Sequence, residues 1–242
     1  MKIIASDFDG TLTYKGGVSE ADRRAIETFR RAGHKFGVVT GRDIPMARDI
    51  MVRHDFHPDF LICCTGAAIL GEDGRVLYQK QGKIGNFMNE IFGHACALGA
   101  QTFTVNDGPL KYFADVTGAT PFDLSAFSGF TQANVHFSDP APAEKFTALM
   151  RERYSDLIAA HRNGRDVDMP PPGTSKVTGI YEYAKAFDAP EIYTVGDNAN
   201  DLSMIREFCG YAVQNAVDAV KAEADHLCDR VCDMIDGILR EG

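Results

Sequence analysis

The sequence predicts an α/β fold: a doubly wound parallel sheet with a second α/β domain inserted into it. Three β-prone runs, at residues 2–6, 34–39 and 191–195, each lead at once into a polar cluster and then into a helical pattern. Strands that alternate with helices in this way form right-handed βαβ units with parallel strands. Between about residues 82 and 164 no β-prone run ends in such a cluster, which indicates a different, inserted unit.

Size and composition are those of an ordinary globular protein. The chain has 242 residues, of which 45% are hydrophobic and 24% charged, enough for one large α/β domain with an insertion or for two modest domains. A net charge of -9 without any block of Lys or Arg excludes a general nucleic-acid binder. No apolar run has the length of a signal peptide or a membrane span, so we expect a cytoplasmic protein that does not bind membranes, as a monomer or a homodimer.

The first crossover helix is predicted at residues 19–33. Ser19 stands at the N-cap position, apolar residues follow at helical spacing, and Gly33 ends the pattern. The helix connects the strand at 2–6 to the strand at 34–39, which completes one βαβ unit.

The middle of the chain predicts a mixed α/β unit. We expect helices at 84–99 and after the proline-containing 139–146, and strands at 101–105, 110–116, 133–138 and 156–162. Gly and Pro are dense near 79–85 and 164–173, where the chain would enter and leave the insertion. The predicted division is a core domain of residues 1–82 and 165–242 and a cap domain of residues 83–164.

Six cysteines are irregularly spaced, at residues 63, 64, 96, 209, 228 and 232. A chain of this size does not need disulfides for stability, so reduced thiols are expected. His226, Cys228 and Cys232 hint at a soft-metal site, but no second Cys or His pair stands at zinc-finger spacing. A structural zinc is therefore disfavoured.

Four aspartates are predicted to converge at one edge of the sheet. Asp7 and Asp9 are two residues apart and point to the same side where the chain is extended, and Asp197 and Asp201 share one side of a helical turn. The ends of parallel strands meet at one edge, where ligands bind. Carboxylates held so close repel one another unless a cation lies between them, and hard oxygen ligands suit Mg²⁺.

The same edge has the features of a phosphate site. Thr40 and Gly41 offer a hydroxyl and a backbone amide where a strand leads into a helix. Lys176 begins a helix after the insertion and is the candidate cation, ahead of Lys145 and Lys185, which fit less well. With such a cation and Mg²⁺, an aspartate can attack phosphorus, while a second carboxyl protonates the departing alkoxide.

These residues resemble one superfamily in four places. "DFDGT" (7–11), "VVTGR" (38–42), the lysine of "GTSK" (173–176) and "GDNANDLSM" (196–204) match, in order, the motifs of the haloacid dehalogenase-like hydrolases. The long insertion and the form of the last motif resemble the Cof-type sugar-phosphate phosphatase branch. The archaeal phosphoglycolate phosphatases, which share its topology, are a close alternative because the cap is short. The resemblance implies a Rossmann-like core with an inserted α/β cap.

The resemblance also implies a role for each matched residue. Asp7 would be the nucleophile and a metal ligand, and Asp9 the general acid/base with its carbonyl on the metal. Asp197 would bind Mg²⁺, with Asp201 supporting the metal or the lysine from close by. The residues implied to bind phosphate are Thr40, Gly41, Lys176 and Asn200. The inserted segment would be a mobile cap that closes over the core and contacts the leaving group.

The expected function is Mg²⁺-dependent hydrolysis of a small phosphorylated metabolite, a sugar phosphate or phosphoglycolate, through an aspartyl-phosphate. A phosphomutase and a non-catalytic binding module on the same fold are the alternatives. Two positions depart from the family's usual residues, because Thr65 replaces asparagine and Val177 replaces glycine. Arg42 would contact substrate or form a salt bridge, whereas His136 and His161 are expected to be structural.

Overall fold

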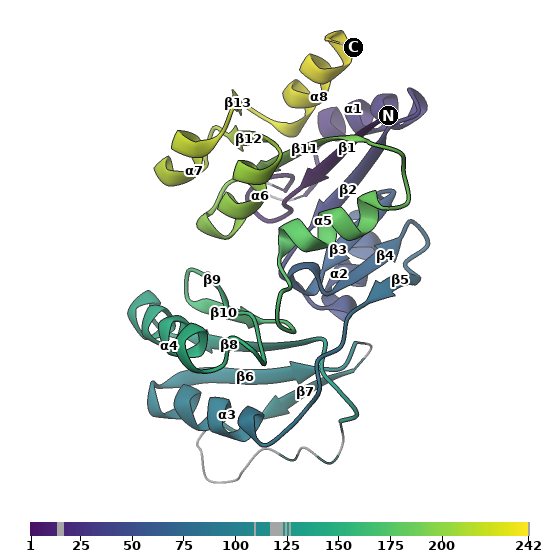
Figure 1. The fold of residues 1–242 in the computed structure, drawn as a ribbon. Helices are drawn as coiled ribbons and strands as arrows, with labels where there is room; N and C mark the ends of the chain where they lie inside the picture. Colours follow the sequence, from purple (N-terminus) through teal and green to yellow (C-terminus); the bar gives the residue numbers. More distant parts are fainter. Residues whose placement is uncertain (14–16, 109, 117–122, 124, 126, 242) are drawn as a thin grey trace.

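The computed structural model describes residues 1–13, 17–108, 110–116, 123, 125 and 127–241. Figure 1 shows two bodies, an upper one that contains both termini and a lower one built from the middle of the chain. The upper body holds an eight-stranded sheet and the lower body a five-stranded sheet. The predicted α/β class with an inserted cap is confirmed. No helix among the described residues combines the length and the apolarity needed to cross a membrane.

The large sheet has the strand order β13-β12-β11-β1-β2-β3-β4-β5. The strands from β13 to β3 pair in parallel, and β4 and β5 extend the sheet in antiparallel fashion. Their bounds are β1 Lys2–Ser6, β2 Lys35–Val39, β3 Phe60–Cys63, β4 Ala68–Gly71, β5 Val76–Gln79, β11 Glu191–Gly196, β12 Cys209–Val213 and β13 His226–Cys228. The three strands predicted from polar clusters are neighbours at the centre of this sheet, in the order β11-β1-β2.

Helices cover both faces of the large sheet. Ile4 of β1 packs on one side with α1, α2 and α8, while Ile3 and Ala5 pack on the other with α5 and Met204 of α6. The helices are α1 Glu20–Arg31, α2 Ile44–His54, α5 Lys176–Ala184, α6 Leu202–Glu207, α7 Asp218–Glu223 and α8 Val231–Arg240, with single 3-10 turns η1 Cys64–Gly66 and η2 Ala199–Asp201. As predicted, Ser19 caps α1, since its side chain accepts a hydrogen bond from the Asp22 backbone.

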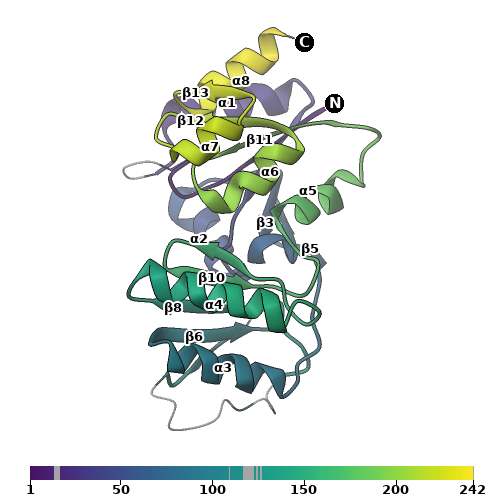
Figure 2. The same cartoon turned by 60° about the vertical axis from the view of Figure 1, so that its left-hand side comes forward.

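The cap sheet is antiparallel, with the order β7-β6-β8-β10-β9. Its elements are α3 Phe87–Ala97, β6 Ala100–Asn106, β7 Lys111–Ala114, β8 Gln132–Phe137, α4 Pro140–Arg153, β9 His161–Asn163 and β10 Asp166–Met169. Both helices lie over one face of the sheet (Figure 2), where they bury its apolar side chains. The opposite face carries polar side chains and is turned toward the core.

The predicted C-terminal boundary of the cap domain is wrong. The boundary between residues 164 and 165 falls inside the β9–β10 hairpin, because β10 pairs with both β9 and β8 of the cap sheet. The sequence "DVDM" alternates polar and apolar residues, and Val167 and Met169 are buried in the cap's apolar core. The strand expected at 156–162 is likewise displaced, since regular pairing begins only at His161.

Candidate active site

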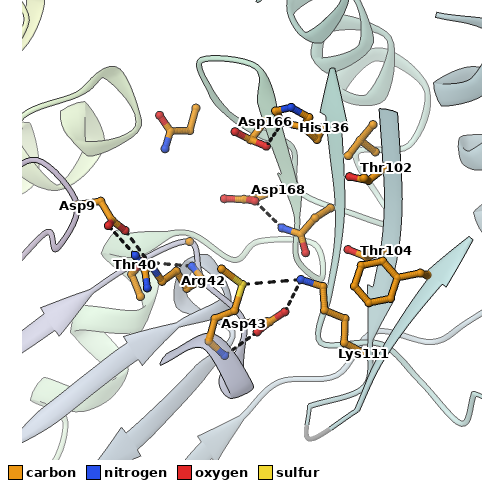
Figure 3. Close-up of a pocket in the computed structure, with 16 residues that line it drawn as sticks. Asp9, Thr40, Arg42, Asp43, Thr102, Thr104, Lys111, His136, Asp166 and Asp168 are labelled. Carbon is orange, nitrogen blue, oxygen red and sulfur yellow. Dashed lines mark hydrogen bonds and ion pairs between the residues drawn. The ribbon is translucent and has the colours of Figure 1, made fainter. Parts of the chain in front are cut away.

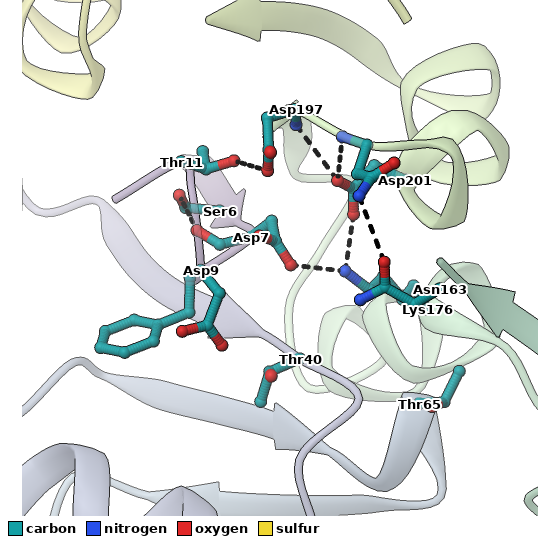
Figure 4. A network of polar contacts seen from close by, with 12 residues as sticks. Ser6, Asp7, Asp9, Thr11, Thr40, Thr65, Asn163, Lys176, Asp197 and Asp201 are labelled. Carbon is teal, nitrogen blue, oxygen red and sulfur yellow. Dashed lines mark hydrogen bonds and ion pairs between the residues drawn. The ribbon is translucent and has the colours of Figure 1, made fainter. Parts of the chain in front are cut away.

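The functional side chains lie where the three central strands end. Asp7 follows β1, Thr40 follows β2 and Asp197 follows β11, so chain positions far apart in sequence meet at one edge (Figure 4). Backbone hydrogen bonds hold this edge together, since the Asp7 amide donates to Val195 O at 2.9 Å and the Thr40 amide to Ile62 O at 2.9 Å. The positions of these side chains are therefore set by the register of the parallel sheet.

Three of the four predicted aspartates form a cluster. One carboxylate oxygen from each of Asp7, Asp197 and Asp201 lies within 4.8 Å of the others. Asp201 belongs to η2 and is fully buried, and its Oδ2 accepts hydrogen bonds from the backbone amides of Asp197 and Asn198, both at 3.1 Å. Among the described residues no other group of three or more His, Cys, Asp or Glu side chains, from His226 to Cys232 or elsewhere, brings its ligand atoms this close together.

Lys176 bridges two members of this cluster. Its Nζ donates to Asp7 Oδ1 and to Asp201 Oδ1, both at 2.6 Å, and only 2% of the side chain is exposed. Lys176 is the first residue of α5, which Ser175 and Thr178 cap reciprocally. Close packing positions this helix, because a Cβ at Gly66 would collide with Ser175 O.

The electrostatics follow from burial of several charges together. Burial, and then the charge of Asp201, raise the pKa of Asp7 to about 8, although Lys176 lowers it. Burial also raises the pKa of Asp197, while the hydrogen bond from Thr11 Oγ1 at 2.8 Å opposes the shift. Burial alone would lower the pKa of Lys176, but the carboxylates of Asp201 and Asp7 outweigh it and raise that pKa above its ordinary value.

The cluster fits a divalent cation. Three carboxylates against one ammonium leave two negative charges in a buried site, and one divalent ion neutralises them. The donors are all hard oxygens, and each Asp201 oxygen already accepts hydrogen bonds. Asp7 and Asp197 are therefore the residues that would hold Mg²⁺ directly, with Asp201 orienting Lys176 and the backbone of Asp197 and Asn198.

Asp9 is not part of the cluster through its side chain. Its carboxylate is 57% exposed and forms two hydrogen bonds with Arg42, from Nε to Oδ2 at 2.9 Å and from Nη2 to Oδ1 at 2.6 Å. All four aspartates were expected to converge, whereas in the structure the carboxylates of Asp7 and Asp9 have different partners. Figure 4 shows Asp9 turned away from Asp7, toward Thr40.

The remaining predicted phosphate ligands surround the same edge. Thr40 is buried, and its Oγ1 accepts a hydrogen bond from the Arg42 amide at 3.2 Å. Gly41 lies directly against the cap, where Gln132 Nε2 donates to its carbonyl at 2.8 Å. Asn200 follows in η2, and its buried Oδ1 has no hydrogen-bond partner among the described residues. Such an orphaned acceptor beside the cluster is consistent with a ligand site.

A cavity of about 500 Å³ opens between core and cap beside these residues (Figure 3). Its core wall runs from Asp9 through residues 40–43 to Met46, and its cap wall is formed by β6, β7, β8, β9 and β10. Two contacts join cap and core beside the cavity. Lys111 Nζ of the cap forms an ion pair with Asp43 Oδ2 at 2.9 Å, and Thr65 Oγ1 of the core donates a hydrogen bond to Asp168 Oδ2 at 3.3 Å. The cavity has room for a small organic molecule next to Asp9, Thr40 and Gly41.

Comparison with known protein families identifies the chain. The family model of haloacid dehalogenase-like hydrolases matches residues 4–241, nearly the whole sequence. The chain belongs to this family. The resemblance inferred from the four motifs is thereby confirmed, and the cluster of Asp7, Lys176, Asp197 and Asp201 stands at the positions of those motifs.

Solved structures share the fold of this haloacid dehalogenase-like hydrolase over its full length. A haloacid dehalogenase-like hydrolase from Bacillus subtilis has 20% identity and a TM-score of 0.83, covering 98% of this chain and 99% of its own. A putative HAD/Cof-like hydrolase from Plasmodium vivax has 16% identity and a TM-score of 0.78, and the match covers 100% of this chain and 96% of that protein's chain. A subclass IIB sugar phosphatase has 18% identity and a TM-score of 0.75, covering 100% and 99%. The search among curated proteins found no match.

Sequence reasoning missed several residues of this hydrolase that the fold brings to the cavity, chief among them Asp168, Asn134 and Lys111. The polar-apolar alternation of 166–169 was the available signal for Asp168, because it predicts a strand with one face open to solvent. His161 is structural as expected: burial lowers its pKa, and its ring hydrogen-bonds to Thr174 O at 2.7 Å. His136 instead lines the cavity and pairs with Asp166 at 2.7 Å.

Proposed function

We propose that this chain is a Mg²⁺-dependent phosphatase that hydrolyses the phosphate ester of a small metabolite. The observation that carries the proposal is the bridge from Lys176 Nζ to Asp7 and Asp201, both at 2.6 Å, beside Asp197. A buried ammonium held between carboxylates at a strand edge neutralises a phosphoryl group as it approaches the nucleophile. Membership of the hydrolase family supports the same reading.

Asp7 is the proposed nucleophile. Its carboxylate oxygen attacks phosphorus, the bond from phosphorus to the ester oxygen breaks, and an aspartyl-phosphate forms. Lys176 and the Thr40 hydroxyl hold the phosphoryl oxygens during the transfer, and the Gly41 amide adds a further donor. Mg²⁺ bound by Asp7 and Asp197 would neutralise phosphoryl charge and keep Asp7 ionised, since a nearby cation lowers the pKa of a carboxyl group.

Asp9 is the proposed acid/base. It gives its proton to the departing ester oxygen in the first step, and in the second step it takes a proton from the water that attacks the aspartyl-phosphate. The second step breaks the bond between phosphorus and the Asp7 oxygen, which regenerates the carboxylate and releases inorganic phosphate. Arg42 holds the Asp9 carboxylate beside the phosphate loop through two hydrogen bonds, which orients it for both steps.

Release of inorganic phosphate tests the proposal. A panel of sugar phosphates, phosphoglycolate, nucleotides and p-nitrophenyl phosphate is assayed with Mg²⁺ and again with a chelator. We expect release only with Mg²⁺, no release by Asp7→Asn, and wild-type release by Asp156→Asn, an exposed carboxylate in the turn after α4. Substantial release by a clean Asp7→Asn preparation would refute the nucleophile assignment.

A second experiment distinguishes the phosphatase from the two alternative functions. Rapid quenching with labelled substrate measures whether the phosphoryl group passes from Asp7 to water or returns to a hydroxyl of the product. Transfer to the product identifies a phosphomutase, and Mg²⁺ binding without turnover of any ester identifies a binding module.

A further inference from the structure

The cap sheet turns one polar face toward the cavity. Alternate residues of its strands are apolar and pack under α3 and α4, among them Phe103, Val135 and Val167. The residues between them line the cavity and are paired across the sheet by its register. One row consists of Thr104 on β6, Asn134 on β8 and Asp168 on β10, which are direct cross-strand neighbours.

This row contains hydrogen-bonding atoms without a partner. Asn134 Nδ2 donates to Asp168 Oδ1 at 2.6 Å, which leaves Asn134 Oδ1 buried and unpartnered among the described residues. Thr104 is 4% exposed, and its Oγ1 is unpartnered in the same way. Buried polar atoms without partners are costly, and in a cavity wall they indicate a ligand that supplies the missing hydrogen bonds.

The charges around the cavity favour one kind of ligand. The lysine and arginine side chains in the described lining are already paired with carboxylates, in the pairs Arg42–Asp9 and Lys111–Asp43, and the His136 ring lies against Asp166. Asp168 forms no ion pair within the described part of the chain. Figure 3 shows Asp168 projecting into the space between the two walls. Above about pH 7, where the Asp168 carboxyl is ionised, the cavity therefore offers unpaired negative charge and acceptor atoms, and the lysine and arginine of its described lining are already paired.

Asp168 also lies close to the phosphate loop. Thr65 Oγ1 donates to Asp168 Oδ2 at 3.3 Å, and a Cβ at Gly41 would collide with that same oxygen. Gly41 is one of the residues proposed to hold the phosphoryl group. A ligand group bound by Asp168 is therefore near the ester oxygen, within the first carbons of the leaving alcohol.

We propose that Asp168, with Asn134 and Thr104, binds hydrogen-bond donors on the leaving alcohol, so that the enzyme takes phosphate esters with hydroxyl or amino groups near the ester and rejects those with a carboxylate there. The proposal rests on the phosphatase function proposed above and decides between the two substrate classes left open by the sequence. A carboxylate beside ionised Asp168 meets like charge and the unpartnered acceptor Asn134 Oδ1, which disfavours phosphoglycolate.

Matched esters test this selectivity. 2-Hydroxyethyl phosphate and phosphoglycolate differ only by a hydroxymethyl in place of a carboxylate, and 2-aminoethyl phosphate and ethyl phosphate supply the amine and the compound without a donor. Above about pH 7, where the Asp168 carboxyl is ionised, we expect kcat/KM for 2-hydroxyethyl phosphate to exceed that for phosphoglycolate by about tenfold or more. The ratio between the hydroxyl and amino compounds identifies which donor the row prefers.

A variant of Asp168 provides a second test of the selectivity. Asp168→Asn keeps the shape and removes the charge, so the preference for 2-hydroxyethyl phosphate over phosphoglycolate should fall by about tenfold. Asp156→Asn, an exposed cap carboxylate outside the cavity, should leave the ratio unchanged. An unchanged ratio in Asp168→Asn would overturn the assignment of Asp168.

The two proposals fail in different ways. If p-nitrophenyl phosphate is hydrolysed with Mg²⁺ but phosphoglycolate is used as well as 2-hydroxyethyl phosphate, the phosphatase function stands and the selectivity proposal falls. Calorimetric titration of Asp7→Asn with the two esters measures the same preference without turnover. Equal or tighter binding of phosphoglycolate by that variant would overturn the selectivity proposal even if no ester is hydrolysed.

Discussion

Arg42 donates two hydrogen bonds to the carboxylate of Asp9, from Nε at 2.9 Å and from Nη2 at 2.6 Å. The guanidinium carbon also lies 5.3 Å from the centre of the Phe8 ring, and the Arg42 amide donates to Thr40 Oγ1 at 3.2 Å. One residue therefore connects the proposed acid/base to the loop proposed to bind phosphate. The planar fork of arginine suits this two-point contact, whereas lysine would provide only one charge.

Arg42→Ala should lower kcat about 10- to 100-fold, because Asp9 loses the contact that orients it. The melting temperature should change little, since exposed ion pairs contribute about 0–1 kcal/mol. Arg42→Lys should recover part of the rate, because charge is kept and the fork is lost. Steady-state kinetics with p-nitrophenyl phosphate and thermal unfolding measure the two effects. A wild-type kcat in Arg42→Ala would contradict the positioning role.

Lys176→Met should destabilise the fold at pH 7 by about 3–5 kcal/mol, because Asp7 and Asp201 lose their shared buried partner. The loss should shrink as pH falls through about 8, where the Asp7 carboxyl becomes protonated, and added Mg²⁺ should restore part of it. Urea unfolding at about pH 9 and pH 6 provides the measurement. The exposed Lys185→Met is the control, and similar destabilisation in both variants would argue against a special role for the bridge.

Mg²⁺ should raise the melting temperature. At a concentration of 100 times its dissociation constant, a ligand adds about 2.7 kcal/mol of stability, which corresponds to about 5–10 °C for a chain of this size. Asp197→Asn should abolish most of the shift, because it removes one of the two proposed direct ligands. Thermal scans with and without a chelator measure it. A shift of equal size in Asp197→Asn would place the bound ion elsewhere.

Asp168 should make the protein less stable as pH rises. Burial raises its pKa from 3.8 to about 7, although hydrogen bonds from Asn134 and Thr65 oppose the shift. Between these values the folded state holds a proton that the unfolded state has lost, so this contribution is present below about pH 4 and is lost through pH 7. Asp168→Asn should therefore be stabilised relative to wild type by on the order of 2–4 kcal/mol above pH 7, with the difference vanishing near pH 4.

Chemical unfolding of both proteins from pH 4 to pH 8 measures this dependence. A stability difference that stays constant over the whole range would show that the Asp168 carboxyl titrates normally in the folded protein.

The core elements could be predicted because their signals are local. The apolar run before Asp7, the cap at Ser19 and the strand before Thr40 each appear in a few consecutive residues, and the structure has β1, α1 and β2 there. The convergence of Asp7, Asp197 and Asp201 was predictable for a general reason, since parallel strands end at the same edge.

The C-terminal boundary of the cap was predicted wrongly because the local composition favours a linker, whereas strand pairing makes the segment part of the cap sheet. Gly164 and the prolines from residue 170 onward favour a linker, yet the residues between them alternate and pair as β10. Pairing with β8 and burial of Val167 and Met169 stabilise this strand. Neither can be read from 166–169 alone, because the partner strand lies some thirty residues earlier in the chain.

The sequence by itself determined the α/β class, the family and the residues of the carboxylate-lysine cluster, because these depend on short motifs and on the common direction of parallel strands. Only the tertiary structure decided that Asp9 binds Arg42 and that Asp168 stands against the phosphate loop. Those contacts join residues from separate elements, at distances that depend on sheet register and on how the cap packs on the core. Side-chain pairing across such an interface is a property of the folded chain, and no short stretch of sequence encodes it.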